Sequence, residues 1–236
     1  MSTMVTLKIN GEEVEAEAGR NLMSVALEND IFIPGLCRFK GLDPVGACRL
    51  CIVEVKEVPR LLPACATTVA EGMEVFTETE KVLEYRKMIL ELLFSERNHV
   101  CSICVVNGHC ELQSLAERLG VHHSRYTYRY PDHKVDATHS RFSFDANRCI
   151  LCTRCVRVCE DVEGAKTWGI SGRGIQSNVM ADLDGNWGDS ETCTSCSKCV
   201  HVCPTGALFE KGRATGEMVK RENILPYLQT MRANTR

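Results

Sequence analysis

Two stretches with the same cysteine spacing decide the fold: Cys149-Ile-Leu-Cys152-Thr-Arg-Cys155-Val-Arg-Val-Cys159 and Cys193-Thr-Ser-Cys196-Ser-Lys-Cys199-Val-His-Val-Cys203-Pro204. Each reads C-x2-C-x2-C-x3-C, and we find no other internal repeat in the 236 residues. Thiolates in such runs are the ligands of four-iron clusters. Disulfides and zinc are the alternatives, and the odd total of 15 cysteines together with the CxxC spacing disfavours disulfides.

The two runs predict two sites that exchange a ligand. In bacterial ferredoxins with two clusters, the fourth cysteine of each run binds the cluster of the other run. One expected site therefore consists of Cys149, Cys152, Cys155 and Cys203. The other consists of Cys159, Cys193, Cys196 and Cys199. Because this exchange ties the runs together, we expect one bacterial-type 2[4Fe-4S] ferredoxin domain over 141–212, with His201 at its surface.

A third group of cysteines is incomplete as a ligand set. Cys101, Cys104 and Cys110 supply three thiolates, whereas a four-iron cube has four ligands. The expected fourth ligand is His99, two residues before the group. The rival is His109, at its end. A neutral imidazole in place of a thiolate removes one negative charge, which makes a cluster easier to reduce.

The N-terminal cysteines have a wider spacing, Cys37-x10-Cys48-x2-Cys51-x13-Cys65. Two thiolates from a tight loop and two from flanking segments can hold a two-iron cluster, with structural zinc as the alternative. Residues 46–47 are small and allow backbone N–H groups to approach the cluster. All 15 cysteines then belong to four groups, so we expect one 2Fe-2S and three 4Fe-4S clusters.

Hydrophobic patterns predict a small mixed α+β domain over 1–78. Apolar residues alternate on both sides of Asn10-Gly11, which predicts a hairpin over 4–17 with a type I′ turn. Further patterns predict a helix over 21–29 and strands over 50–58 and 73–77.

Residues 79–140 are expected to form a helical domain and a surface linker. Thr77 and Glu80 fit a capping box before a helix over 80–96. Its expected apolar face consists of Val82, Leu83, Tyr85, Met88, Ile89, Leu92 and Leu93. A second helix is predicted over 111–119 and the linker over 121–140. The basic tail over 213–236 is expected to be a solvated end, with a docking arm as the alternative.

Composition and missing motifs exclude several function classes. The formal net charge of −3 argues against a basic nucleic-acid binder, and no apolar stretch approaches the roughly 20 residues of a membrane span. The N-terminus lacks an apolar signal core, so we expect a cytoplasmic protein. Gly172-Arg173-Gly174 lacks the third glycine of a dinucleotide fingerprint, and there is no P-loop. We therefore expect no catalytic residue and no FMN or NAD bound by this chain alone.

Four stretches resemble one protein family: Ser95-Glu-Arg-Asn-His-Val-Cys-Ser-Ile-Cys, Asn107-Gly-His-Cys-Glu-Leu-Gln, Arg148-Cys-Ile-Leu-Cys-Thr-Arg-Cys-Val-Arg-Val-Cys and Cys203-Pro-Thr-Gly-Ala-Leu-Phe. They are similar to the diaphorase iron–sulfur subunit of NAD-reducing bidirectional [NiFe] hydrogenases. The order of the sites is also similar to the N-terminal region of the large iron–sulfur subunit of respiratory complex I. In the complex I pattern the histidine stands four residues before the first cysteine, where this sequence has Arg97.

The resemblance implies an α+β fold with an N-terminal β-grasp 2Fe-2S ferredoxin domain, a helical His/Cys 4Fe-4S domain and the 2[4Fe-4S] domain. It implies a non-catalytic electron-transfer subunit of a hydrogen:NAD+ oxidoreductase. The implied partners are a flavin- and NAD-binding diaphorase subunit and the small and large subunits of a [NiFe] hydrogenase. The alternatives are an electron-input subunit of an NAD-dependent formate dehydrogenase or iron-only hydrogenase complex, and a free multi-cluster ferredoxin.

Overall fold

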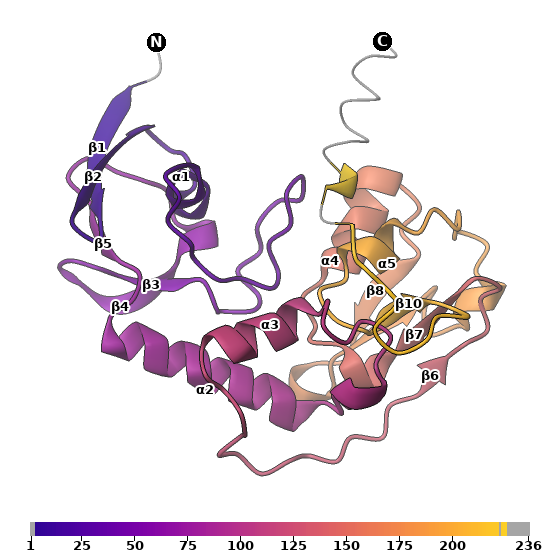
Figure 1. The fold of residues 1–236 in the computed structure, drawn as a ribbon. Helices are drawn as coiled ribbons and strands as arrows, with labels where there is room; N and C mark the ends of the chain where they lie inside the picture. The colour runs from indigo at the N-terminus through magenta and orange to yellow at the C-terminus, as the bar shows by residue number, and fades with distance from the viewer. Residues whose placement is uncertain (1–2, 222, 226–236) are drawn as a thin grey trace, which may run out of the picture.

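The computed structural model describes residues 3–221 and 223–225, which form two packed regions (Figure 1). A five-stranded sheet with one helix makes up the N-terminal region, and small sheets with short helices make up the C-terminal region. Helices α2 (Glu80–Glu96) and α3 (Glu111–Arg118) lie along one side and join the two regions (Figure 1). Among the helices of these residues, none has both the length and the hydropathy that crossing a bilayer requires.

The N-terminal sheet has the strand order β2-β1-β5-β3-β4. Its strands are β1 (Met4–Ile9), β2 (Glu12–Glu17), β3 (Ile52–Val55), β4 (Val58–Pro63) and β5 (Glu74–Phe76). Strands β1 and β5 are parallel, and the other neighbours are antiparallel. The predicted hairpin is confirmed, because Asn10 (φ 54°) and Gly11 (φ 88°) both have the positive φ of a type I′ turn.

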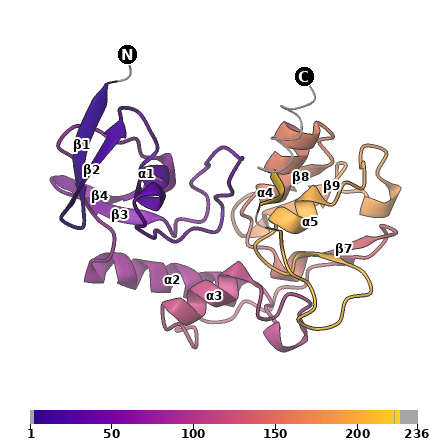
Figure 2. The ribbon, with the colours of Figure 1, turned by 45° about the horizontal axis from the view of Figure 1, so that its top comes forward.

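Helix α1 (Leu22–Glu28) confirms the helix predicted over 21–29. The side chain of Asn21 caps it by accepting hydrogen bonds from the backbone N–H groups of Met23 and Ser24. The buried face of α1 packs on the sheet in one core with Leu7, Ile9, Val53 and Val75. Figure 2 shows α1 on the side of the sheet that faces the C-terminal region.

The helix predicted over 80–96 is present as α2, but its predicted cap is wrong. Thr79 is the residue whose side chain accepts the hydrogen bond from the backbone N–H of Val82. Thr77 instead pairs with Asn10, donating its backbone N–H to Oδ1 and accepting from Nδ2, both at 2.8 Å. Thr77 therefore anchors the hairpin turn to the end of β5.

The predicted apolar face of α2 is also wrong in part, since Tyr85 and Leu92 are exposed. The buried residues of α2 are Val82, Arg86, Leu90, Glu91 and Ser95. Arg86 can be buried because its guanidinium donates to the carbonyl oxygens of Leu50 and Ile52, at 3.0 and 2.9 Å. Hydrophobicity alone thus misplaces the buried face of α2, because the charged Arg86 on that face finds hydrogen-bond partners.

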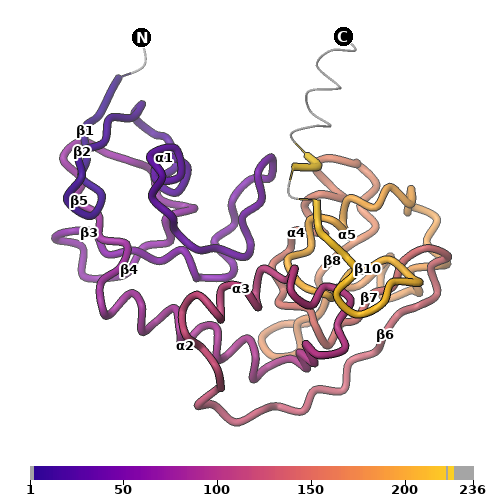
Figure 3. The backbone as a smooth tube through the Cα atoms, in the orientation of Figure 1, coloured from indigo at the N-terminus to yellow at the C-terminus, as the bar shows by residue number. Residues whose placement is uncertain are grey.

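The segment over 121–140 has little regular structure, although its His139 is buried against Phe142 and Trp187. It contains one two-residue strand, β6 (Val135–Asp136), and runs along the outer edge of the molecule from α3 towards the C-terminal region (Figure 3). The ion pair of Arg125 and Glu91, at 2.8 Å, ties this segment to α2.

The C-terminal region contains two small sheets, ordered β10-β7-β6 and β8-β9. Its elements are β7 (Phe142–Asp145), α4 (Arg154–Arg157), a π-helical turn (Val158–Glu163), β8 (Trp168–Ser171), β9 (Asn178–Ala181), α5 (Lys198–Val202) and β10 (Leu208–Glu210). Single 3₁₀ turns lie at Ala64–Ala66, Cys101–Ile103, Ala146–Arg148, Gly174–Gln176 and Trp187–Asp189. Residues 160–192, between the two cysteine runs, contain the hairpin of β8 and β9. Trp168 and Trp187 of this segment are buried in the core with Phe142.

The described part of the tail differs from the expected solvated end, while residues 222 and 226–236 lie outside the described residues. Met218 and Leu225 are buried in the C-terminal core. The backbone N–H of Met218 donates to the carbonyl of Val105 at 2.9 Å. The ammonium of Lys220 donates to two carbonyls, those of Val200 and Leu208. The tail therefore packs over α5 and the loop of Cys104, because Met218 and Leu225 are buried there and Lys220 finds carbonyl partners.

Candidate metal centres

Three cavities in the described chain are each lined by one predicted four-iron ligand set. The first-run site is lined by Cys149, Cys152, Cys155 and Cys203. The second-run site is lined by Cys159, Cys193, Cys196 and Cys199. The histidine site is lined by His99, Cys101, Cys104 and Cys110. The last cysteine of each run thus lies in the cavity of the other run. Among the described residues, no group of three or more His, Cys, Asp or Glu side chains has the arrangement that would hold a single metal ion.

Repeated backbone turns place the first three cysteines of each run around one cavity. Leu151 (φ 53°) and Thr153 (φ 61°) have left-handed conformations, and the matching Ser195 (φ 55°) and Ser197 (φ 64°) have the same ones. These turns separate the first three cysteines, and α4 or α5 then presents the third. Left-handed residues other than glycine are costly. Their recurrence at matching positions indicates that the ligand geometry requires them.

The first-run site is enclosed by protein. Burial raises the pKa of Cys149 to about 11 and that of Cys152 to about 12, and it raises the pKa of Cys155 well above its usual value. Buried thiolates without a counter-charge are unfavourable. Bound iron would supply that charge, and the thiols would lose their protons on binding it. The donor set and its burial therefore fit a metal cluster.

The second-run site lies closer to solvent and receives both tryptophans of the chain. Cys199 is buried, whereas Cys196 is exposed. The indole N–H of Trp187 donates to Cys193 Sγ at 3.2 Å. Burial raises the pKa of Cys199, and a hydrogen bond from Trp168 opposes this change. No sequence signal pointed to these donors, because their spacing from the cysteines follows no motif.

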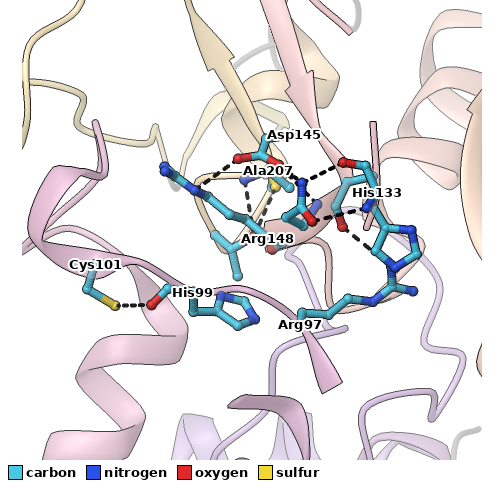
Figure 4. Close-up of polar contacts among 11 residues, drawn as sticks. Arg97, His99, Cys101, His133, Asp145, Arg148 and Ala207 are labelled. Carbon is cyan, nitrogen blue, oxygen red and sulfur yellow. Dashed lines mark hydrogen bonds and ion pairs between the residues drawn. The ribbon is translucent and has the colours of Figure 1, made fainter. Parts of the chain in front are cut away.

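His99 has the surroundings of a ligand. Its Nε2 atom is buried and has no hydrogen-bond partner within the described chain, and its side chain lines the same cavity as Cys101. Figure 4 shows the Cys101 thiol directed at the backbone carbonyl oxygen of His99, to which it donates at 3.5 Å. Burial, aided by the charges of Arg148 and Arg97, lowers the pKa of His99 to about 4. The imidazole is therefore neutral at physiological pH, and neutral imidazole is the form that binds metals.

The rival ligand His109, and Arg97 at the position of the complex I histidine, are both directed elsewhere. His109 lines a separate cavity between α1, α3 and the tail. Arg97 is buried, and it donates to the carbonyl of Ser177 at 2.9 Å and contacts His133 (Figure 4). Arg97 thus connects the end of α2 to the β8–β9 hairpin.

Gly206 allows close approach to the histidine site, a role that the sequence analysis missed. A Cβ atom on this residue would lie 2.4 Å from Cys104 Sγ, well inside any real contact distance. Gly206 also lines the cavity of the histidine site. The chain segment after the second run therefore forms one wall of this site. A glycine three residues after the last cysteine of a run is the only sequence signal.

The N-terminal cysteines form one compact group. All four are buried: Cys37, Cys48, Cys51 and Cys65. Hydrogen bonds from the thiols of Cys48 and Cys65 lower the pKa of Cys37, and the backbone N–H groups of Cys48 and Ala47 act in the same direction. The backbone N–H of Leu36 donates to Cys48 Sγ at 3.3 Å. Mutual contact of four thiols, with N–H groups directed at sulfur, fits a two-iron cluster.

Matching positions in the two runs carry a buried cation that the sequence analysis did not single out. Arg154 binds the carboxylate of Glu111 through both Nη atoms, at 2.6 and 2.8 Å. Lys198, at the same place in the second run, pairs with Glu163. A basic residue directly before the third cysteine of both runs was the available signal. These pairs connect each run to the element packed against it.

Three family models match the chain in succession. Residues 2–80 match a 2Fe-2S iron–sulfur cluster binding domain. Residues 86–125 match the NADH-ubiquinone oxidoreductase-G iron–sulfur binding region. Residues 140–209 match the ferredoxin-like domain of NADH-quinone oxidoreductase subunit 3. The chain is therefore an α+β protein with 2Fe-2S and 4Fe-4S binding domains.

Two relatives and one solved structure show how far the similarity extends. An NADH-quinone oxidoreductase subunit of Rhizobium meliloti is 38% identical over 209 residues, but the chain spans 24% of its length. The gamma subunit of the NAD-reducing hydrogenase HoxS of Cupriavidus necator is 34% identical, over 89% of this chain and 88% of the relative. A chain in the crystal structure of an NAD+-reducing [NiFe]-hydrogenase in the H2-reduced state superposes with a TM-score of 0.84 at 34% identity, over 89% of this chain and 88% of that one. The chain thus belongs to the family of iron–sulfur electron-transfer subunits that includes the gamma subunit of NAD-reducing hydrogenase.

Proposed function

We propose that the chain relays electrons between a flavin- and NAD(H)-binding diaphorase subunit and a [NiFe] hydrogenase module. The observation that carries the proposal is the 34% identity to the HoxS gamma subunit along 88% of that relative. Four clustered ligand sets within one small chain support it, because several iron–sulfur centres in series conduct electrons. The protein contributes the ligands, their burial and the N–H donors, and the clusters supply one-electron exchange.

The proposed cofactors are one 2Fe-2S and three 4Fe-4S clusters. The ligands of the two-iron cluster are Cys37, Cys48, Cys51 and Cys65. The four-iron ligands are the residues of the first-run, second-run and histidine sites, with His99 as the only nitrogen ligand. Three cavities with four donors each support this complement.

The reduction potential of the histidine site tests whether His99 is the nitrogen ligand. We expect this potential to fall in His99→Cys and to stay unchanged in His109→Ala.

The proposed domains are 1–78, a β-grasp 2Fe-2S domain; 79–140, the histidine-site domain and linker; 141–212, the 2[4Fe-4S] domain; and 213–236, the tail. A mixed sheet packed on one helix supports the first. The packing of Met218 and Leu225 on the C-terminal core indicates that part of the tail belongs structurally to the third.

The proposed partners are the diaphorase subunit and the small and large hydrogenase subunits, in the cytoplasm. The similarity to the HoxS gamma subunit and the superposition on a chain of an NAD+-reducing [NiFe]-hydrogenase support this assembly. The hydrogenase subunit HndD of Solidesulfovibrio fructosivorans is 36% identical, but the chain spans only 36% of it. The match to the putative formate dehydrogenase YrhE of Bacillus subtilis covers 18% of that relative.

Anaerobic affinity purification of the tagged chain from its native cells tests the proposal. We expect a flavoprotein and two hydrogenase subunits to co-purify, and metal analysis to find nickel beside iron. The same purification from cells without the hydrogenase subunits should recover the diaphorase without nickel. Molybdenum in place of nickel, or recovery of the chain alone, would contradict the proposal.

A further inference from the structure

Arg157 joins the two-iron region to the first-run site through one guanidinium group. Its Nη2 atom donates to the carbonyl oxygen of Cys37 at 2.6 Å and to that of Cys152 at 3.3 Å. Its Nη1 atom donates to the carbonyl of Asp43 at 2.6 Å. Its Nε atom donates to Thr153 Oγ1 at 3.2 Å. The side chain therefore holds two segments that are more than a hundred residues apart in sequence.

The two segments carry proposed ligands of different clusters. Cys37 is a ligand in the two-iron set, and Cys152 is a ligand in the first-run site. Both cysteines belong to one apolar cluster, with Leu36, Cys48, Leu50, Leu90, Leu112, Leu115 and Ile150. The guanidinium thus lies where the loops of two neighbouring centres meet, away from bulk water.

The charge of Arg157 is not neutralised by its hydrogen-bond partners. Within the described chain, its four acceptors are three carbonyl oxygens and one hydroxyl, all of them neutral. Burial lowers the pKa of Arg157, and the nearby Cys152 and Cys37 oppose that change. A buried cation is costly unless anions compensate it. Cluster thiolates on either side would supply that compensation, together with the carboxylate of Asp161.

The second run lacks this connection. His201 occupies the position that matches Arg157, and its Nδ1 atom is buried without a hydrogen-bond partner in the described residues. It is not at the surface as expected, because the tail and β10 cover α5, and Nε2 lies 4.0 Å from Glu210. The bridge is therefore a particular feature of the first run.

We propose that Arg157 is a positioning residue that fixes the two-iron centre against the first-run centre and that its charge favours reduction of both. This inference rests on the proposed cluster complement. Removing the guanidinium frees the Cys37 loop from the Cys152 loop and removes a positive charge from between them. Two observable effects follow, which are weaker magnetic interaction between the two reduced centres and lower reduction potentials of both.

Arg157→Met, Arg157→Lys and the control Arg86→Met test the proposal in the anaerobically purified complex. Arg86 is also buried and also binds two carbonyls, but both lie within the N-terminal region. Low-temperature EPR with microwave power saturation measures the interaction, and redox titration measures the potentials. Iron content shows that each variant retains its clusters.

In Arg157→Met we expect the two-iron signal to relax more slowly and both potentials to fall. Arg157→Lys keeps the charge but cannot bond both carbonyls with planar geometry, so it should keep the potentials and lose the interaction. Arg86→Met should leave the interaction as in wild type and move the two-iron potential alone. If Arg157→Met does not retain iron, Arg157→Lys carries the test.

Wild-type relaxation in Arg157→Lys, or a fall of one potential only in Arg157→Met, would overturn the inference and leave the proposed function intact. Wild-type protein that contains iron but gives no two-iron signal would instead overturn the proposed cluster complement, and the inference with it.

Discussion

The two cysteine runs share a backbone but differ in their surroundings. Both have left-handed residues at the same two positions, and both place a buried cation before the third cysteine. In the first run Cys149, Cys152 and Cys155 are all buried, whereas Cys196 of the second run is exposed. Repeated spacing thus determines local ligand geometry, while the neighbouring elements determine whether a site faces the interior or the surface.

The two runs also contact different parts of the molecule. The first run contacts the N-terminal region through Arg157 and α3 through Arg154. The second run contacts the inserted segment, whose Trp168 and Trp187 reach its cysteines. We therefore interpret the first-run site as an internal junction and the second-run site as one adjacent to the surface.

The largest effect is expected from removing the exchanged cysteines. Cys159→Ala should abolish the second-run cluster and leave the first-run cluster, and Cys203→Ala should do the reverse, because each cysteine lies in the other run's cavity. Iron content and the EPR spectrum of the reduced protein measure the loss. As matched controls, Cys196→Ala should remove the same signal as Cys159→Ala, and Cys152→Ala the same as Cys203→Ala. Matching in the opposite pairs would show that no exchange occurs.

The next largest effect is expected from removing the two buried cations, Arg154 and Lys198, and it should differ between them. Arg154→Met is expected to lower stability by about 3 kcal/mol, because it leaves Glu111 and the carbonyl of Val202 without their donor. Lys198→Met should cost less, since the Lys198 side chain is more exposed than that of Arg154. Within the described residues Arg154 also donates three hydrogen bonds, whereas Lys198 donates one. The urea midpoint of the anaerobic holoprotein measures both. Equal losses would contradict the view that the first run is the more deeply integrated one.

Gly206 gives a test that concerns only the segment after the second run. In Gly206→Ala the new methyl group collides with Cys104 Sγ, so the signal of the histidine site should shift or disappear while the other signals persist. Gly169→Ala is the matched control, because its Cβ would lie 3.7 Å from the Met180 methyl group, an ordinary contact. An unchanged histidine-site spectrum in Gly206→Ala would count against this packing.

The smallest effect is expected at Trp187. Trp187→Phe keeps an aromatic ring in the core but removes the N–H donated to Cys193 Sγ. Because such hydrogen bonds stabilise the reduced cluster, the second-run potential should fall while the first-run potential stays constant. Redox titration monitored by EPR measures both values in one sample. A shift at the first-run centre would contradict the assignment of this donor.

Short-range patterns predicted most elements and the grouping of cysteines. The hairpin at Asn10-Gly11, α1, α2 and α3 follow from local periodicity and turn chemistry, and cysteine spacing reflects constraints within a few residues. The sequence could not place Arg157, because its carbonyl partner at Cys37 is determined by how two regions pack. His201 and the face of α2 were misjudged for the same reason, since polar side chains were expected outside and tertiary contacts bury them.

Iron-edge anomalous diffraction from anaerobically grown crystals of the holoprotein tests the central claim most directly. The account predicts four iron–sulfur clusters, a two-iron cluster among Cys37, Cys48, Cys51 and Cys65 and a four-iron cluster in each of the three cavities, with His99 rather than His109 bound to iron. Anomalous signal at the zinc edge instead, or a cavity whose four side chains surround no metal, would contradict it.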